Sequence, residues 1–505
     1  MLTYVFSGGI IGVDGYLVTV ECSITRGLPS LSIVGLPDTA VKESVIRVES
    51  ATHNSGLEFP EAEIVVNLAP ADRKKEGSAL DAAILTAILC AGGVIPQNRE
   101  LGDYCIIGEL SLSGELRPVR GALCIAIAAK AAGVSHLIVP EGNAAEAAAI
   151  PGIEVLAAAT VSDIVSYFRT GDGLRRAEPQ DIHKAQTSTI DFSDIKGQGR
   201  ARRAMEIAAA GRHNILLIGP PGSGKSMIAK RLPTILPEMS YDEALESAKI
   251  HSAAGCIDPD DPIPRVRPFR APHHTMSAPA LVGGGKVPTP GEISLAHRGV
   301  LFLDELPEFN KLVTESLRQP LEDGRVTITR AAARAVFPAS FMLVCAMNPC
   351  KCGYFGSGVR KCTCRPSDIA KYLSRISGPL LDRIDIQIEM PALSFGELSD
   401  TSKSEPSASV RERVERAAQI AQTRQGCPKG ALESAGVREL CTPDEAGLAL
   451  LSAAFERLGM SARGYDRILR VARTVADLAG DERVGAPHIA EALQLRSLDR
   501  KYWER

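Results

Sequence analysis

The sequence NILLIGPPGSGKSMIAKRL occupies residues 214–232, and the other motifs of the chain are best understood around it. Its apolar residues 215–218 predict a short buried strand, and residues 225–232 predict the start of a helix. Between the two, eight residues fit the pattern G-x-x-x-x-G-K-[ST] at every fixed position: Gly219, Pro220, Pro221, Gly222, Ser223, Gly224, Lys225 and Ser226. A strand, a glycine-rich turn and a helix in this order predict a nucleotide-binding loop.

The residue types of this loop suit a triphosphate. Gly222 and Gly224 let backbone N–H groups point at phosphate oxygens, and the helix that follows adds the positive end of its dipole. We expect Lys225 to reach the β- and γ-phosphates and the Ser226 hydroxyl to hold Mg²⁺. The sequence therefore predicts ATP and Mg²⁺ as cofactors.

Two further apolar stretches end in polar residues. Residues 299–305, GVLFLDE, predict a buried strand that ends in two acids, and residues 341–347 predict another that ends at Asn348. Polar groups at the carboxyl ends of parallel strands face the crevice where nucleotides bind. We expect Asp304 to complete the Mg²⁺ shell, Glu305 to act as the general base for the attacking water, and Asn348 to position that water.

A basic stretch surrounds these motifs, although the whole chain has a net charge of only −3. Residues 325–383 contain ten Lys and Arg residues against two acids. The alternation in residues 325–330 and 334–337 predicts a β-hairpin with Arg330 and Arg334 at its tip. A local excess of positive charge suggests an anionic partner. The glycine-rich loop at 283–286 could contact phosphates too, or be a plain surface loop.

The insertion before the second strand contains His273 and His274, which could bind a metal but have no further ligand at suitable spacing. A stronger candidate is a pair of C-x-C motifs, formed by Cys350, Cys352, Cys362 and Cys364. Four thiolates at this spacing could close a tetrahedral Zn²⁺ site, which would be structural because no coordination position stays open. Reduced thiols in a loop are the alternative.

At 505 residues the chain is long enough for several domains. Strand and helix patterns mix over residues 1–168, which we expect to form an α+β domain. Residues 169–190 are polar and without periodicity, so we expect a linker there. We expect a parallel-sheet nucleotide-binding core over residues 191–395 and a helical lid over residues 396–505.

These motifs, together with the segment GPLLDRID at residues 378–385, resemble the AAA+ ATPases, in particular magnesium-chelatase I subunits and MCM helicases. Residues 75–79 and 108–119 resemble the Lon-protease-like fold. The whole chain resembles the YifB/ComM family of magnesium-chelatase-like AAA+ ATPases. This resemblance implies an α/β fold with a P-loop AAA+ core, a helical C-terminal lid and a Lon-like N-terminal α+β domain.

The resemblance also assigns roles to individual residues. Asn348 matches sensor 1, Arg383 matches an arginine finger that reaches a neighbour's γ-phosphate, and Arg463 matches sensor 2 at the nucleotide. Arg467 and Arg470 follow Arg463 at helical spacing, and we expect them on an exposed face. In the Lon-like part Ser78 lies near the position of a nucleophile, but Leu123 stands where the lysine base would be, which argues against peptidase activity.

The resemblance implies a homo-oligomer, a hexamer, that acts as a DNA helicase or branch-migration factor in recombination or natural transformation. We expect sequence-independent binding to single-stranded or branched DNA. The alternatives are a magnesium-chelatase-type motor subunit and a protein-remodelling ATPase. There is no apolar run of about 18 residues and no signal-like start, so we expect a cytoplasmic protein without a membrane segment.

Overall fold

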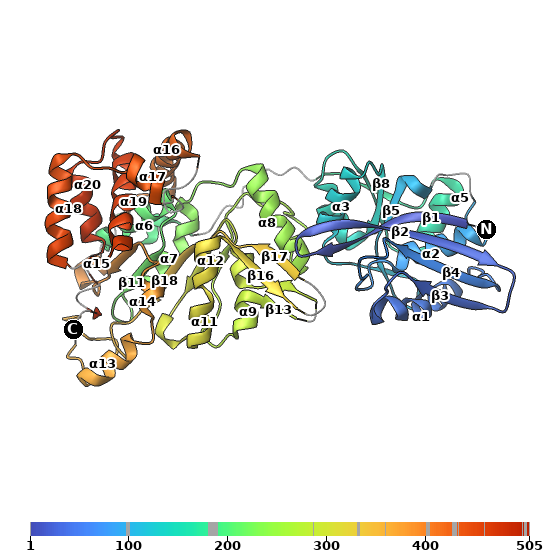
Figure 1. Cartoon of the computed structure of the whole chain (residues 1–505), viewed down its shortest axis with the longest axis horizontal. Coiled ribbons are helices and arrows are strands. Elements are labelled where there is room, and N and C mark those ends of the chain that lie inside the picture. The colour runs from blue at the N-terminus through green and yellow to red at the C-terminus, as the bar shows by residue number, and fades with distance from the viewer. Residues whose placement is uncertain are drawn as a thin grey trace.

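In the computed structural model the chain forms an elongated molecule whose parts follow one another in sequence order (Figure 1). The N-terminal strands lie at one end and the C-terminal helices lie at the other, and the strand before the glycine-rich loop of residues 219–226 lies near the C-terminal helices. The structure describes residues 2–96, 101–179, 190–285, 287–330, 334–358, 360–399, 404–426, 432, 434–458, 460–496, 498, 502 and 503. Lys286, the hairpin tip at 331–333 and residues 180–189 of the expected linker lie outside this part.

The N-terminal part is built on an eight-stranded mixed sheet in the order β10-β9-β8-β5-β1-β2-β4-β3. The bounds of these strands, in chain order, are β1 Leu2–Ile11, β2 Asp14–Thr25, β3 Ser30–Val34, β4 Glu63–Ala69, β5 Tyr104–Ile106, β8 His136–Pro140, β9 Glu154–Ala158 and β10 Arg175–Ala177. The long β1–β2 hairpin is antiparallel, whereas β1, β5, β8 and β9 run parallel to one another. The two-stranded ribbon of β6 (Glu109–Leu110) and β7 (Leu116–Arg117) stands apart from this sheet.

Helices pack on this sheet, and their composition explains how deeply they are buried. They are α1 Thr39–Asn54, α2 Asp81–Ala91, α3 Ala122–Ala131, α4 Ala144–Ala148 and α5 Val161–Thr170. Every residue of α2 is buried, because its sequence DAAILTAILCA has no polar face to turn toward water. The short strand β10 lies inside the stretch expected to be a linker and pairs antiparallel with β9, so the N-terminal sheet continues to Ala177.

The central part contains a five-stranded, entirely parallel sheet in the order β12-β15-β18-β11-β19. Its strands are β11 Ile215–Ile218, β12 Phe269–Arg270, β15 Val300–Leu303, β18 Met342–Met347 and β19 Ile386–Glu389. All residues of β11, β15 and β18 are buried. Continuous apolar strands such as ILLI and VLFL are typical of a parallel sheet whose two faces are both covered.

The helices of the central part vary from four residues to fourteen. They are α6 Gly199–Gly211, α7 Lys225–Arg231, α8 Tyr241–Ala254, α9 Ala278–Val282, α10 Glu292–Leu295, α11 Lys311–Ser316, α12 Arg318–Asp323, α13 Pro366–Leu373, α14 Gly378–Leu381 and α15 Phe395–Ser399. The expected hairpin is present as β16 (Arg325–Thr329) paired antiparallel with β17 (Arg334–Pro338). A second small ribbon joins β13 (Gly283–Gly284) to β14 (Thr289–Pro290).

The C-terminal part is helical, as the sequence predicts. Its helices are α16 Ser407–Gln425, α17 Ser434–Leu440, α18 Glu445–Leu458, α19 Ala462–Ala479 and α20 Ala486–Gln494. The α/β fold class with a helical C-terminal region is therefore confirmed. Across the described residues, no helix combines the length and the apolar character needed to cross a membrane.

The N-terminal part contacts the central part through α3 and α8. The amide of Gly121 donates to the Ser252 carbonyl at 3.0 Å, and the Ser252 hydroxyl donates to the buried Glu146 at 2.7 Å. Val13, in the β1–β2 turn, belongs to the same apolar cluster as Ala335 of β17. The two parts are thus joined at a helix and at the basic hairpin.

Candidate ATP site and arginine cleft

The glycine-rich loop turns between the carboxyl end of β11 and the amino end of α7. Gly222 and Gly224 have φ angles of 78° and 87°, in the left-handed region that glycine adopts at little cost. Gly224 is also the residue that caps α7. The loop therefore has the backbone geometry that the motif predicts, with the helix starting at Lys225.

Lys225 is buried, and its ammonium group is held by uncharged oxygens. It donates to the carbonyls of Gly219 at 2.8 Å and Pro220 at 2.9 Å, and to Asn348 Oδ1 at 3.3 Å. Burial lowers the pKa of Lys225 to about 8, although the charges of Asp304 and Glu305 oppose this shift. Among the described residues no carboxylate forms an ion pair with it. A buried cation in such surroundings suits an incoming anion.

Ser226 and Asp304 meet at the end of the same sheet. The Ser226 hydroxyl donates to Asp304 Oδ2 at 2.5 Å, and the other carboxylate oxygen accepts from the Glu305 amide at 2.9 Å. A hydroxyl and a carboxylate oxygen are ligands that Mg²⁺ commonly takes together with phosphate oxygens and water. These two side chains therefore fit the ion that the motif implies.

Glu305 has an unusual conformation and an unexpected neighbour. Its φ angle of 53° lies in the left-handed region, and its side chain is half exposed. His274 Nδ1 lies 3.6 Å from Glu305 Oε2, and the His274 ring contacts Phe309 edge-on. From the sequence, His274 is indicated only as a possible metal ligand. No local signal links residues 31 positions apart, so only the fold could bring this pair together.

Asn348 lies close to Lys225 because β18, the strand before Asn348, is the direct neighbour of β11 in the sheet. Ile218 and Met347 are partners in the parallel register, so the residues that follow these two strands emerge side by side. Lys225, Ser226, Asp304, Glu305 and Asn348 consequently lie at one edge of the sheet, as the motif positions predict.

Arg383 lies at the opposite edge. It precedes β19, and its carbonyl accepts from the side chain of Asn214, which precedes β11, at 2.8 Å. Its guanidinium group pairs with Glu322 and donates to the Pro379 carbonyl at 2.6 Å. The four residues of β11 span about 13 Å, so Arg383 and Lys225 are at opposite ends of that strand.

Arg463 lines the same cleft as Arg383, together with Arg467 and Arg470 of α19. The cleft has a volume of about 1400 Å³, and none of residues 219–226 lines it. Arg463 was expected at the nucleotide, but within one chain it lies in the cleft with Arg383 and away from the phosphate loop. The sequence could not show this, because the direction of α19 relative to the sheet is a tertiary property.

The expectation of an exposed face is wrong for Arg467, whose side chain is 9% exposed. It lies 3.6 Å from Asp385, a buried carboxylate that also accepts from the Asn214 amide at 3.1 Å. Burial lowers the pKa of Arg467 to about 10. In the described structure, three guanidinium nitrogens of the cleft are buried without a hydrogen-bond partner: Arg383 Nε, Arg467 Nη1 and Arg470 Nε. These three nitrogens are therefore the groups of the cleft that suit an anionic partner, although carboxylates such as Glu322 and Asp385 also line it.

Comparisons with known proteins show which family the chain resembles. Residues 191–398 match the family described as magnesium chelatase, subunit ChlI; residues 20–143 match the subunit ChlI of Mg-chelatase; residues 404–496 match the C-terminal part of that subunit. The competence protein ComM of Haemophilus influenzae is 43% identical over 99% of this chain and 98% of its own length. The chain belongs to the YifB/ComM family of magnesium-chelatase-like AAA+ ATPases.

Two other relatives show how far the likeness extends. The YifB protein of Escherichia coli is 42% identical over 99% of this chain and 98% of its own length. The magnesium-chelatase 38 kDa subunit of Rhodobacter capsulatus is 24% identical over 62% of this chain and 88% of its own length. The YifB/ComM likeness thus covers the whole chain, whereas the likeness to this chelatase subunit leaves more than a third of it unmatched.

In the Lon-like part of the chain, Ser78 lies next to Glu109. The Ser78 hydroxyl donates a hydrogen bond to the Glu109 carboxylate. Leu123 is fully buried in α3. Lys75 is also buried, which lowers its pKa, and its ammonium donates to the carbonyls of Pro70 and Arg73. The structure thus pairs Ser78 with a carboxylate.

The two C-x-C motifs come together in space. The sulfur atoms of Cys350, Cys352, Cys362 and Cys364 all lie within 4.8 Å of one another. Among the described residues, these four cysteines form the group of His, Cys, Asp or Glu side chains whose ligand atoms lie close enough together to hold a metal ion. His273 and His274 do not belong to such a group.

Proposed function

We propose that this protein is an ATP-hydrolysing motor that works as a hexameric ring of identical subunits on single-stranded or branched DNA. The observation that carries the proposal is the separation of the two halves of the catalytic machinery. Lys225 lies at the carboxyl edge of the parallel sheet, whereas Arg383 and Arg463 lie at its amino edge. A single chain cannot bring the two together, so the arginines serve a neighbour.

The ATP site then works as follows. Lys225 holds the β- and γ-phosphates, and Glu305 accepts a proton from the water that Asn348 orients. Ser226 and Asp304 would hold Mg²⁺, which would supply charge neutralisation at the phosphates. The partnerless guanidinium nitrogens in the cleft of the adjacent subunit meet the transferred phosphoryl group and stabilise the charge that develops on it.

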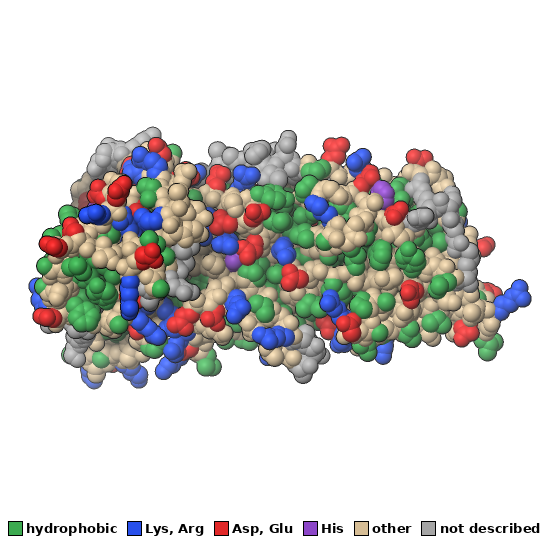
Figure 2. All heavy atoms as spheres, turned by 45° about the horizontal axis from the view of Figure 1, so that its top comes forward, with side chains coloured by type: hydrophobic (Ala, Val, Ile, Leu, Met, Phe, Trp, Pro, Cys, Tyr) green, Lys and Arg blue, Asp and Glu red, His purple; other side chains and the backbone are tan. Residues whose placement is uncertain are grey.

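The hairpin β16–β17 is the proposed contact with DNA. Arg330 and Arg334 are exposed at its tip, and Arg330 Nη2 lies 3.6 Å from the position that a Cβ on Gly284 would take. The two small ribbons are therefore neighbours. Figure 2 shows basic and acidic side chains interspersed over the face that it presents. We therefore assign the DNA contact to these two ribbons. Such a contact would be insensitive to the base sequence, because phosphates carry no base information.

The comparisons support this proposal to different degrees. A relative that matches nearly the whole chain carries the name competence protein, which is compatible with work on incoming DNA. A chelatase-type motor subunit is the second candidate, because a magnesium-chelatase subunit matches over 88% of its own length.

The deciding experiment measures the steady-state ATPase rate against protein concentration, with and without forked DNA at low salt. We expect a cooperative rise with concentration, because each site needs a neighbour's arginine, and a further rise with DNA. A rate that rises with concentration but ignores DNA would favour the chelatase-type motor. If the ATPase rate per subunit stayed constant down to concentrations at which the protein is monomeric, the proposed ring would be contradicted.

A further inference from the structure

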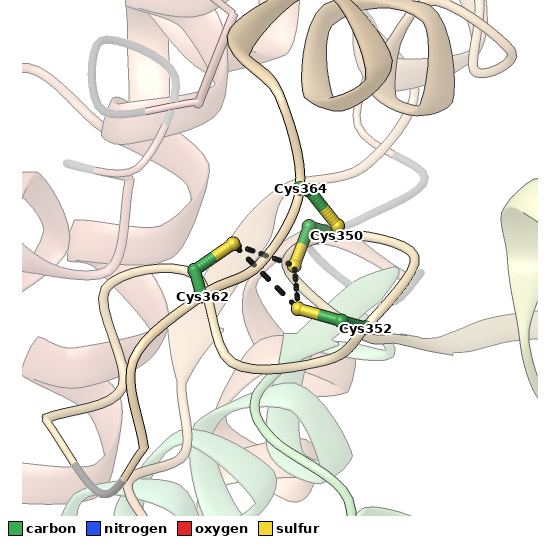
Figure 3. Close-up of side chains that lie close together, drawn as sticks. All are labelled: Cys350, Cys352, Cys362 and Cys364. Atoms are coloured by element: carbon green, nitrogen blue, oxygen red, sulfur yellow. Dashed lines mark hydrogen bonds between the residues drawn. The ribbon is translucent and has the colours of Figure 1, made fainter.

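The four clustered cysteines have the geometry of a metal site. The sulfur of Cys350 lies 3.4 Å from that of Cys352 and 3.7 Å from that of Cys362, and the last two are 3.6 Å apart. Sulfur atoms on a tetrahedral zinc ion lie about 3.8 Å apart, because each Zn–S bond is about 2.3 Å long. Figure 3 shows the four sulfurs gathered between the two loop segments that carry them.

These cysteines differ from most of the other cysteines that the structure describes. Cys22, Cys90, Cys105 and Cys345 are buried within strands or helices as small apolar residues. The clustered ones lie in a loop between β18 and α13, where the Phe355 amide also donates to the Cys350 sulfur at 3.4 Å. Amide donors of this kind favour a negatively charged sulfur. Four thiolates this close would repel one another without a cation between them.

The same loop rests on the nucleotide site. Gly353 has a φ angle of 85°, and a Cβ atom there would come within 2.5 Å of the Pro221 ring in the phosphate loop. Cys350 is only two residues after Asn348, whose side chain contacts Lys225. The cysteine loop therefore lies against the phosphate loop and begins next to Asn348, the residue proposed to orient water.

We propose that Cys350, Cys352, Cys362 and Cys364 bind one structural Zn²⁺, and that the resulting zinc loop supports the phosphate loop through the contact between Gly353 and Pro221. Zinc suits the site because four thiolates and no open position are typical of a structural zinc centre. The second half of this proposal rests on the proposed ATP site, whereas the first half does not.

The first test is metal analysis of the purified full-length protein. We expect one zinc per chain, and the tetrahedral thiolate absorption bands of Co²⁺ when cobalt replaces it. The variant C352S/C362S should lose the metal, whereas C256S should keep it, because Cys256 is exposed and outside the cluster. Iron in place of zinc, or no metal and no cobalt spectrum in the wild-type protein, would overturn the site.

The second test separates the metal from its effect on ATP. Gly353→Ala should keep one zinc per chain, which also shows that the loop is folded, and should weaken binding of an ATP analogue by roughly tenfold. Removal of zinc from the wild-type protein with a chelator should weaken binding similarly, and added zinc should restore it. Unchanged affinity in both cases would overturn the support role and leave the metal site standing. If the wild-type protein bound zinc but no ATP, the proposed function would fail instead.

Discussion

Arg383 forms an ion pair with Glu322 of its own chain, and its side chain is 11% exposed. If Arg383 acts as the proposed arginine finger, it has to leave Glu322 before it can reach a neighbour's phosphate. The pair would therefore keep an isolated subunit inactive and release the arginine when a more strongly charged partner arrives.

The first prediction concerns this arginine. Arg383→Ala should lower kcat by about 10³-fold or more and leave ATP binding intact, because the arginine acts on the transition state of another subunit. Mixing R383A chains with K225A chains should restore part of the activity, since a ring can then combine an intact phosphate loop with an intact finger. No recovery in mixed rings of confirmed composition would argue against action between subunits.

The second prediction uses the pKa of Lys225, which burial lowers to about 8. Below pH 8 Lys225 is already charged in the free protein. The contribution of Lys225 to ATP affinity should therefore be nearly independent of pH in that range. Above pH 8 binding must first recharge the lysine, because phosphate favours the charged form, and affinity should fall by up to about tenfold per pH unit. Titrations with a non-hydrolysable ATP analogue between pH 7 and 9.5 measure this slope.

A matched variant gives the control for the pH titration. Lys225→Arg keeps its charge over this range, so whatever binding it retains should lack the alkaline decline. A flat profile for the wild-type protein, or the same decline in both proteins, would mean that Lys225 does not titrate as described.

The third prediction concerns Glu305. Glu305→Gln should bind ATP with nearly unchanged affinity and turn over about 10²-fold to 10⁴-fold more slowly, since the amide cannot accept a proton from water. Lys225→Ala should instead lose ATP binding. Single-turnover assays beside equilibrium binding distinguish the two, and normal turnover by E305Q would show that the base is misassigned.

The fourth prediction concerns His274, which lies 3.6 Å from Glu305. If His274 positions that carboxylate, His274→Ala should lower kcat by about 10-fold to 100-fold with little change in ATP affinity. His273→Ala is the control, because His273 Nδ1 forms its hydrogen bond with the Thr275 hydroxyl at 2.9 Å and its ring lies tilted against that of His274, whereas the ion-pair contact with Glu305 is made by His274. Equal losses in both variants would indicate a general disturbance of the loop.

The fifth prediction concerns the hairpin. Replacing Arg330 and Arg334 together by alanine should spare basal ATPase activity and remove its stimulation by DNA, with a smaller dependence of DNA binding on salt. Arg325→Ala, at the other end of β16, should keep the stimulation. Loss of basal activity in the double variant would make the hairpin part of the nucleotide site.

The sequence by itself determined the local features of this protein. The glycines of the phosphate loop, the acids after the strand at 300–303, Asn348 and the β16–β17 hairpin could all be predicted, because short-range sterics and the periodicity of apolar residues specify each of them within a few positions. The spacing of the two C-x-C motifs also indicates a cluster of four cysteines.

Only the tertiary structure decided which distant segments meet. The insertion of β18 between β15 and β11 brings Asn348 to Lys225. The packing of α19 against α6 and the other C-terminal helices brings Arg463 to Arg383 at the opposite edge. The contact of His274 with Glu305 and that of Gly353 with Pro221 arise in the same way. Strand order and helix direction depend on the packing of the whole core, and no short pattern of residues encodes them.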